Sequence, residues 1–192
     1  MELKKAIYER RSIRKYKNDP IKAEDIADIL AAGMMAPSGV DLQPWYFVVA
    51  QSEEAMKDVK QIMRDSAPAM MPSIKERFAK HPQVVKETET FLTGLGGAPL
   101  CIMVFVNKSD HKKAESTIIQ SVAAAIQNML LTAYDKGLGS CWMTAPLETG
   151  ADKRFKQRFA PEKGDMVALI TLGYPEQEGK MTRRKPGRFE IV

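Results

Sequence analysis

Apolar residues recur at helical spacing in two long stretches of this chain, and these stretches predict its principal helices. Over residues 23–34 the apolar side chains fall at positions i, i+3, i+4, i+7 and i+8, beginning with Ile26. Over residues 117–136 the same spacing continues for more than four turns, and small alanines occupy a second face. That helix is therefore expected to be buried on most sides. Weaker patterns predict shorter helices near 3–7, 53–64, 73–79, 83–92 and 149–158.

Continuous apolar runs predict the strands, and the longest of them suit a sheet with both faces covered. The runs are residues 45–50, 99–106, 140–143 and 166–174. Helices and strands follow one another without the strict alternation of a doubly wound parallel sheet. This order favours an α+β fold, with helices around a mixed, mostly antiparallel sheet. Nothing marks a second domain, so residues 1–192 are expected to form a single one.

Residues 65–97 interrupt the regular pattern. They contain three prolines, a Met-Met pair and the sequence TGLGG, and they are too apolar for a linker. We therefore expect an excursion that packs over the main body. Such segments often act as lids or specificity elements.

Composition narrows the class of protein. Of the 192 residues, 44% are apolar and 28% are charged, which is ordinary for a globular domain. No apolar run approaches the roughly 18 residues of a membrane span, and the first residues lack a signal-peptide pattern, so a cytoplasmic protein is expected. Cys101 and Cys141 lie in apolar surroundings and are expected to be reduced packing residues rather than a disulfide. His81 and His111 are far apart, so no metal site is expected.

Positive charge gathers at the two ends of the chain, although the net charge is only +5. Such runs are usually solvated faces or tails. The alternative is that both clusters converge on one anion. The residues concerned are Lys4, Lys5, Arg10, Arg11, Arg14, Lys15 and Lys17 at one end and Lys180, Arg183, Arg184, Lys185 and Arg188 at the other.

Glycine-rich nucleotide motifs do not account for that charge. The sequences GLGGAP (94–99) and GLGSCW (137–142) each lack the third glycine of a dinucleotide fingerprint, and each precedes a strand instead of following one. A GxSxG nucleophile elbow is absent as well. If a nucleotide binds here, side chains must do what a glycine loop normally does.

Three side chains near the start of the chain suit that task. In an extended segment, Arg10, Ser12 and Arg14 point the same way, while Ile13 and Tyr16 pack inward. Arginine makes planar, bidentate hydrogen bonds to phosphate. The alternative interpretation is a solvated basic turn after a helix.

Two further segments carry candidate binding groups. The sequence APSGVDLQPW (36–45) presents a hydroxyl, a carboxylate and an amide between a helix and a strand, which suits the polar edge of a flat heterocycle. The sequence SCWMTAPLE (140–148) leaves a strand through small residues that allow close backbone approach to a ligand. Taken singly, each segment is also explained as an irregular turn.

Together these segments resemble the nitroreductase family of FMN-dependent oxidoreductases. The resemblance rests on five sequences in order: ERRSIRKY, ILAAGMMAPSGVDLQPWYFVVA, QSVAAAIQNMLLTAYDKGLGSCWM, ALITLGYPE and RRKP. It runs from about residue 5 to residue 190 and weakens only over 52–97. Five ordered sequences are a specific signal, unlike any one of them.

The resemblance implies a homodimer with two FMN sites, each built from both subunits and holding the flavin non-covalently. It also implies that helix 117–136 lies in the dimer interface and that the tail 180–192 reaches the partner subunit. Ser121 is a weaker candidate contact, and Arg183 and Lys185 are possible neighbours of the phosphate. The residues that it places at the cofactor are Arg10, Arg11, Ser12, Arg14 and Arg184 around the phosphate and pyrimidine side, Pro37, Ser38, Gly39 and Asp41 from the partner, and Met143, Thr144 and Ala145 at the ring.

The resemblance further implies ping-pong hydride transfer from NADH or NADPH, through the flavin, to a nitroaromatic, a quinone or a similar acceptor. It demands no catalytic side chain, because the cofactor carries the chemistry. Family members commonly have asparagine where this chain has Asp41, and a carboxylate there is expected to lower the flavin potential. The alternatives are a related enzyme that fragments flavin or removes halogen, a flavin carrier without turnover, and a nucleic-acid-binding protein.

Overall fold

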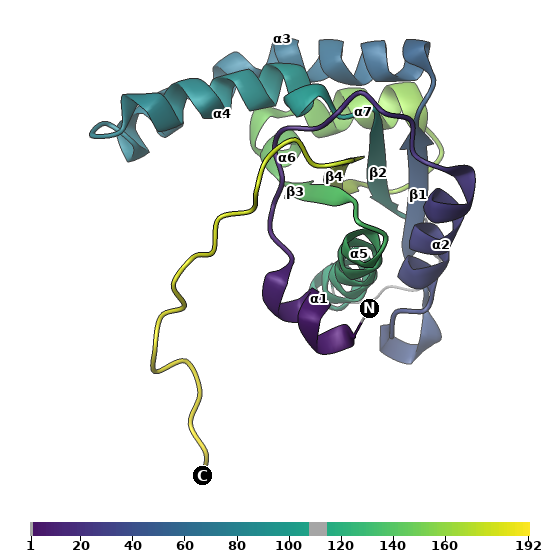
Figure 1. Ribbon diagram of the computed structural model, residues 1–192. Coiled ribbons are helices and arrows are strands. Elements are labelled where there is room, and N and C mark those ends of the chain that lie inside the picture. The colour runs from purple at the N-terminus through teal and green to yellow at the C-terminus, as the bar shows by residue number, and fades with distance from the viewer. Residues whose placement is uncertain (1, 108–114) are drawn as a thin grey trace.

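A four-stranded antiparallel sheet forms the centre of the protein, as seen in a computed structural model that describes residues 2–107 and 115–192. His111 lies outside the described residues. The strand order is β1-β2-β4-β3, and the described strands contain no parallel pair. The expected α+β architecture is therefore confirmed (Figure 1). The strands are β1 (Trp45–Ala50), β2 (Leu100–Val106), β3 (Gly139–Met143) and β4 (Met166–Gly173).

Helices cover both faces of the sheet, which explains why β2 and β4 read as continuous apolar runs. Ile102 and Val104 of β2 pack in one core, whereas Cys101 and Met103 pack in the core on the opposite face. Every residue of β4 is buried. The first core lies against α2 (Ala23–Met34) and α5 (Glu115–Asp135). The second lies against α3 (Glu53–Arg77), α4 (Pro82–Gly94), α6 (Ala145–Thr149) and α7 (Ala151–Phe159).

The α5 helix is buried along one apolar face. The expected burial on most sides is not found within one chain, because Ala123 and Ala124 on the second face are only half-buried and Ile119 is exposed.

The last turn of α5 is joined to α2 by Lys136, which forms ion pairs with Asp25 and Asp28. The hydrogen bonds to these two carboxylates raise the pKa of Lys136. At the same end of α5, the Tyr134 hydroxyl lies 3.0 Å from the carboxylate of Glu9, the last residue of α1 (Leu3–Glu9).

The helix expected near residues 53–64 does not end there. It continues through Pro68 and Pro72 to Arg77 as one helix, so the separate helical piece expected over 73–79 is wrong. Each proline removes one backbone hydrogen bond, but burial of apolar side chains such as Met71 and Ile74 against α4 holds the helix together. With α4 it forms a helical hairpin that projects from the body (Figure 1).

The remaining boundaries differ in detail. The helix expected near 149–158 is α7, and it is preceded by a short helix, α6, that was not expected. Gly150 separates the two, and its φ of +73° favours glycine. After Tyr174 the chain forms no further helix or strand, and from residue 178 onward it is almost entirely exposed. Within the described residues, no helix is both long enough and apolar enough to cross a membrane.

Cys101 makes stability depend on pH at the alkaline end. Burial raises the pKa of this thiol from 9.0 to about 12. Above its ordinary pKa the unfolded chain therefore loses a proton that the folded chain keeps, and stability falls as pH rises. We expect Cys101 to account for a loss of about 1 kcal/mol in unfolding free energy between about pH 8 and about pH 10. Urea denaturation at both pH values measures it.

The matched variant for this measurement is Cys101→Ala. Its absolute stability is lower because it leaves a small cavity, but the decline between the two pH values should shrink by that same 1 kcal/mol or so. An undiminished decline in Cys101→Ala would mean that other groups, such as the buried Tyr16, are responsible for the alkaline loss.

Candidate functional site

The segment after α1 lies along the exposed edge of the sheet, next to β3. Ile13 donates its backbone N–H to the carbonyl of Ser140 (3.0 Å), and Ser12 and Ser140 form a parallel bridge. Ile13 and Tyr16 are buried, as predicted. Arg10 and Ser12 are half-buried and Arg14 is exposed, so the polar side chains remain on the accessible side of this segment.

A glycine turn at the end of α4 supports the same segment from the other side. Gly96 accepts a hydrogen bond from the backbone N–H of Tyr16 (2.9 Å). It has a φ of +63°, and a Cβ there would overlap the backbone carbonyl of Arg14. The Arg14 guanidinium lies 5.8 Å from the centre of the Phe91 ring of α4. The helical hairpin is thus in direct contact with the arginine segment.

The chain after β4 runs antiparallel to the arginine segment. Lys17 donates to the carbonyl of Tyr174 (2.9 Å), and Glu176 donates to the carbonyl of Lys15 (3.0 Å). Further on, the backbone N–H of Arg14 lies 3.2 Å from the side-chain oxygen of Gln177. No apolar pattern or turn motif in the sequence predicts this pairing of the chain after β4 with the arginine segment.

Positive charge accumulates at Arg10. Burial lowers the pKa of its guanidinium, and the charges of Arg11 and Arg184 lower it further. Arg184 belongs to the tail, so one charge of the second basic cluster acts on the first. The close approach of like charges is unfavourable by itself. A bound anion would relieve this repulsion between the guanidinium charges. The arrangement therefore suits a phosphate.

Cys141 lies beneath these arginines on β3. Burial raises the pKa of its thiol, whereas the Arg14 charge, the Ser12 hydroxyl and the Arg10 charge lower it. Three of the four predicted site residues of the segment, all except Arg11, therefore act on this one sulfur atom. The sequence indicated only a packing role for this cysteine. Side chains alternate between the two faces of a strand, and this alternation along β3 is the one sequence signal that could have placed Cys141 beneath the site.

Met143, Thr144 and Ala145 lie where β3 ends and α6 begins. Met143 and Ala145 are buried, and only the side chain of Thr144 is exposed. The Thr144 hydroxyl lies 3.4 Å from the carboxylate of Glu148. This turn therefore presents mainly backbone groups, on the same strand that carries Cys141.

The loop after α2 is an unusual turn held by its own side chains. Ser38 accepts a hydrogen bond from the backbone N–H of Gln43 (3.0 Å), and Asp41 accepts one from the Gln43 side chain (2.9 Å). Val40, Asp41 and Gln43 all have positive φ values, between 45° and 55°. Such conformations are uncommon for residues other than glycine and often mark functional loops. Pro37 and Asp41 are exposed.

Within one chain, this loop does not join the arginine segment. The backbone N–H of Gly39 lies 3.2 Å from the Ser121 hydroxyl of α5, whereas α1 contacts α5 at Tyr134. At about 1.5 Å per residue, these two points on α5 are roughly 20 Å apart. Figure 1 also shows the loop that follows α2 on the opposite side of α5 from the segment that follows α1.

Comparison with known proteins gives a consistent result. The family model described as "Nitroreductase family" matches residues 7–174. A protein of Archaeoglobus fulgidus, named provisionally as an NADH dehydrogenase/NAD(P)H nitroreductase, is 31% identical over 92% of this chain and 87% of its own length. A nitroreductase of Bacteroides fragilis, crystallised with bound FMN, is 26% identical with a TM-score of 0.73, and the alignment covers 100% of this chain and 99% of that one.

Relatives with other names match over similar lengths. An iodotyrosine deiodinase of Thermotoga neapolitana is 26% identical over 87% of this chain and 85% of its own length. A 5,6-dimethylbenzimidazole synthase of Rhodospirillum rubrum is 29% identical over 88% of this chain and 80% of its own length. Proteins similar to this chain therefore carry names for more than one reaction.

Proposed function

This chain belongs to the nitroreductase family, and on that basis we propose that it is an FMN-dependent oxidoreductase. It takes a hydride from NADH or NADPH and delivers it to a nitroaromatic, a quinone or a similar small acceptor, in ping-pong order. The observation that carries the proposal is the segment that lies along β3 and presents Arg10, Ser12 and Arg14 on its accessible side. The charge of Arg184 acts on the same place. The identity of the cofactor is inferred from a relative, because a nitroreductase with bound FMN aligns over this whole chain.

The residues around Arg10 fit the phosphate of FMN. Arg10, Arg11, Arg14 and Arg184 offer guanidinium donors, and Ser12 adds a hydroxyl between them. Charge-assisted hydrogen bonds of this kind are about twice as strong as neutral ones. Met143, Thr144 and Ala145 offer backbone groups to the ring. When bound, FMN supplies the chemistry of hydride acceptance and donation. The chain's own task is to bind, orient and shield it.

The remaining groups come from a second subunit in the proposed homodimer. Pro37, Ser38, Gly39 and Asp41 are too far along α5 to serve the arginines of their own chain, so they serve those of the partner. Unburied apolar residues support such an interface. They lie on α1, on α5 and in the tail that we propose reaches the partner: Leu3, Ile7, Tyr8, Ile119, Phe189, Ile191 and Val192.

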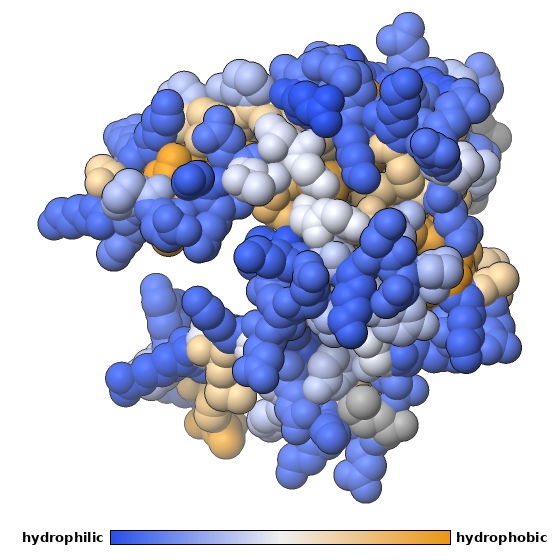
Figure 2. Space-filling model, turned by 45° about the horizontal axis from the view of Figure 1, so that its top comes forward, coloured by the Kyte–Doolittle hydropathy of each residue, from blue (hydrophilic) through white to orange (hydrophobic). Residues whose placement is uncertain are grey.

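The helical hairpin of α3 and α4 forms one wall of the site in this proposal. Figure 2 shows a broad hollow between that hairpin and the tail, and Figure 1 shows the segment after α1 rising between the two. Residues 65–97 would then lie over the flavin and shape the space for the acceptor. The hairpin and residues 180–192 would be parts of one domain spanning 1–192.

A visible absorption spectrum tests the proposed function. Purified protein, or protein reconstituted with FMN, should show bound flavin, and anaerobic NADPH or NADH should bleach it. Protein that neither contains flavin nor takes it up would overturn the proposal. Bound flavin that neither nucleotide reduces would indicate a carrier instead.

The names of two relatives favour a second candidate, in which the same site performs dehalogenation or flavin fragmentation. Product analysis distinguishes the candidates. Reduced nitroaromatic or quinone products under anaerobic conditions support the proposal. Halide release from a halogenated phenol, or cleavage of the flavin in air, would replace it with one of the others.

Asp41→Asn is expected to raise the reduction potential of the bound flavin. A carboxylate near the ring opposes the negative charge that the ring gains on reduction, and an amide does not. We expect a rise of about 30 mV, which corresponds to a tenfold change in a two-electron equilibrium. Anaerobic titration with a reference dye measures it. An unchanged or lower potential would contradict the role of Asp41.

Asn is well suited to this position, because Asp41 has a φ of 55° and asparagine tolerates that region. The variant should therefore keep the loop. Asp19→Asn is the matched control, since Asp19 is exposed in the turn before α2 and makes the same change of charge. Its flavin potential should equal that of the wild-type protein.

A further inference from the structure

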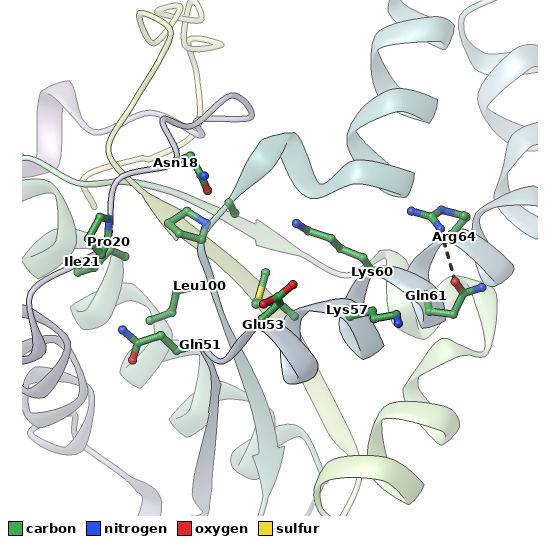
Figure 3. Close-up of a pocket in the computed structure, with 13 residues that line it drawn as sticks. Asn18, Pro20, Ile21, Gln51, Glu53, Lys57, Lys60, Gln61, Arg64 and Leu100 are labelled. Atoms are coloured by element: carbon green, nitrogen blue, oxygen red, sulfur yellow. Dashed lines mark hydrogen bonds between the residues drawn. The ribbon is translucent and has the colours of Figure 1, made fainter.

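A groove lies beside α3, at the end of the sheet where β1 ends and β2 begins (Figure 3). It has a volume of about 560 Å³, within the usual range for small-molecule sites. Its walls come from the first turns of α3, from the segment before α2 and from the turn before β2. None of the residues proposed for the flavin lines it.

The α3 helix presents opposite charges on two sides. Of its acidic residues near the groove, most face α7 instead, where Asp58 pairs with Arg158 (2.7 Å) and Asp65 pairs with Arg154 (2.8 Å). Glu54 also approaches Arg158 (3.6 Å). The negative charge of α3 is therefore largely compensated within the protein.

The basic residues in the first half of α3 lie on the groove side. Lys57, Lys60 and Arg64 line the groove and follow one another at helical spacing. Among the residues that the structure describes, none of the three has a carboxylate within ion-pair distance. Arg64 donates a hydrogen bond to the amide oxygen of Gln61 (3.4 Å). Glu53 is the single acidic residue in the lining, so the groove carries a net positive charge.

The two ends of the groove differ in chemistry. Figure 3 shows Asn18, Pro20, Ile21, Gln51 and Leu100 at one end, Glu53 and Lys60 in the middle, and Lys57, Gln61 and Arg64 at the other. One end thus offers an apolar floor with two amides, and the other offers cations. Lys60 is half-buried, and its charge acts on the buried thiol of Cys101 beneath it.

We propose that this groove is a second ligand site, which binds a nucleoside polyphosphate separately from the flavin. The base lies on Pro20, Ile21 and Leu100, where the amides of Asn18 and Gln51 bind its polar edge. The phosphates lie between Lys60, Lys57 and Arg64. A free polyanion would use only the cationic end, and an uncharged nucleoside only the apolar end, so the pairing of both ends favours the nucleotide.

Calorimetric titration with ADP tests this site, using protein supplied with excess FMN so that the arginines around Arg10 are occupied. ADP should bind at least about tenfold more tightly than pyrophosphate or adenosine, because only ADP engages both ends. The double variant Lys57→Gln/Lys60→Gln should bind ADP about tenfold or more weakly. Both lysines are on the surface of α3, and circular dichroism verifies that the variant is folded.

Lys75→Gln provides the matched control, because it removes an exposed charge from the same helix outside the groove. It should leave ADP binding unchanged. Equal affinities for ADP and pyrophosphate, equal losses in the control and the double variant, or no ADP binding would each overturn the second site. Protein that binds ADP in this manner but never binds FMN would instead overturn the proposed function and leave this site standing.

Discussion

Arg10→Ala is expected to weaken FMN binding about 100-fold. A hydrogen bond to a charged group contributes about 1.5 to 3 kcal/mol, and Arg10 is half-buried, so solvent screens its charge less than that of the exposed Arg14 and Arg184. Quenching of FMN fluorescence on titration with apoprotein measures the dissociation constant. The effect should be larger than that of any single exposed arginine in the cluster.

The same variant should not lose stability in the absence of FMN. Burial and the charges of Arg11 and Arg184 lower the pKa of Arg10, which means that its charged form is disfavoured in the folded apoprotein. Removing that charge leaves apoprotein at least as resistant to urea as wild type. Arg77→Ala, at the end of α3, is the control and should change neither property. If Arg10→Ala unfolded the apoprotein, its role would be structural.

Gly96→Ala is expected to lower the unfolding free energy by about 2 to 4 kcal/mol, because it combines backbone strain with a steric overlap. Gly96 has a φ of +63°, and a methyl group there would meet the carbonyl of Arg14. The backbone of the arginine segment must move to accommodate it. We therefore also expect weaker FMN binding. Urea denaturation of the apoprotein and FMN titration measure the two effects separately.

Gly94→Ala is the matched control for that substitution. Gly94 ends α4 with a φ of −112°, and a Cβ there would meet no atom within 4 Å. An alanine at such a position changes stability by less than about 1 kcal/mol and often increases it. Equal losses in the two variants would show that the contact between Gly96 and Arg14 is not responsible.

The sequence was sufficient to predict the sheet and the inward side of the arginine segment. Continuous apolar runs identify strands that are covered on both faces, and the polar alternation of Arg10, Ser12 and Arg14 around buried Ile13 follows from extended geometry. Convergence of the two basic clusters is one of the two interpretations that the charge pattern allows, and the charge of Arg184 does act on Arg10.

Other features depend on tertiary contacts that leave no local signal. The prolines of α3 indicated a helix end, but burial against α4 outweighs the hydrogen bonds that they remove. The left-handed conformation of Val40 has no signal in the sequence, because valine rarely adopts it. Hydrogen bonds of Ser38 and Asp41 with Gln43 hold the turn. The groove beside α3 joins residues from three separated segments, which no single motif could reveal.

The pairing of the tail with the arginine segment also bears on how the protein folds. Arg14 and Gln177 are 163 residues apart in the chain, and contacts between such distant residues form slowly because a large loop must close. The helical hairpin relies on neighbours in sequence, and the hydrogen bonds that join α2 to α5 and to Lys136 after it span shorter separations of 96 and 108 residues. We therefore expect the core to assemble before the phosphate-binding surface does. Acquisition of the cofactor would then mark the last step of maturation, not the collapse of the core.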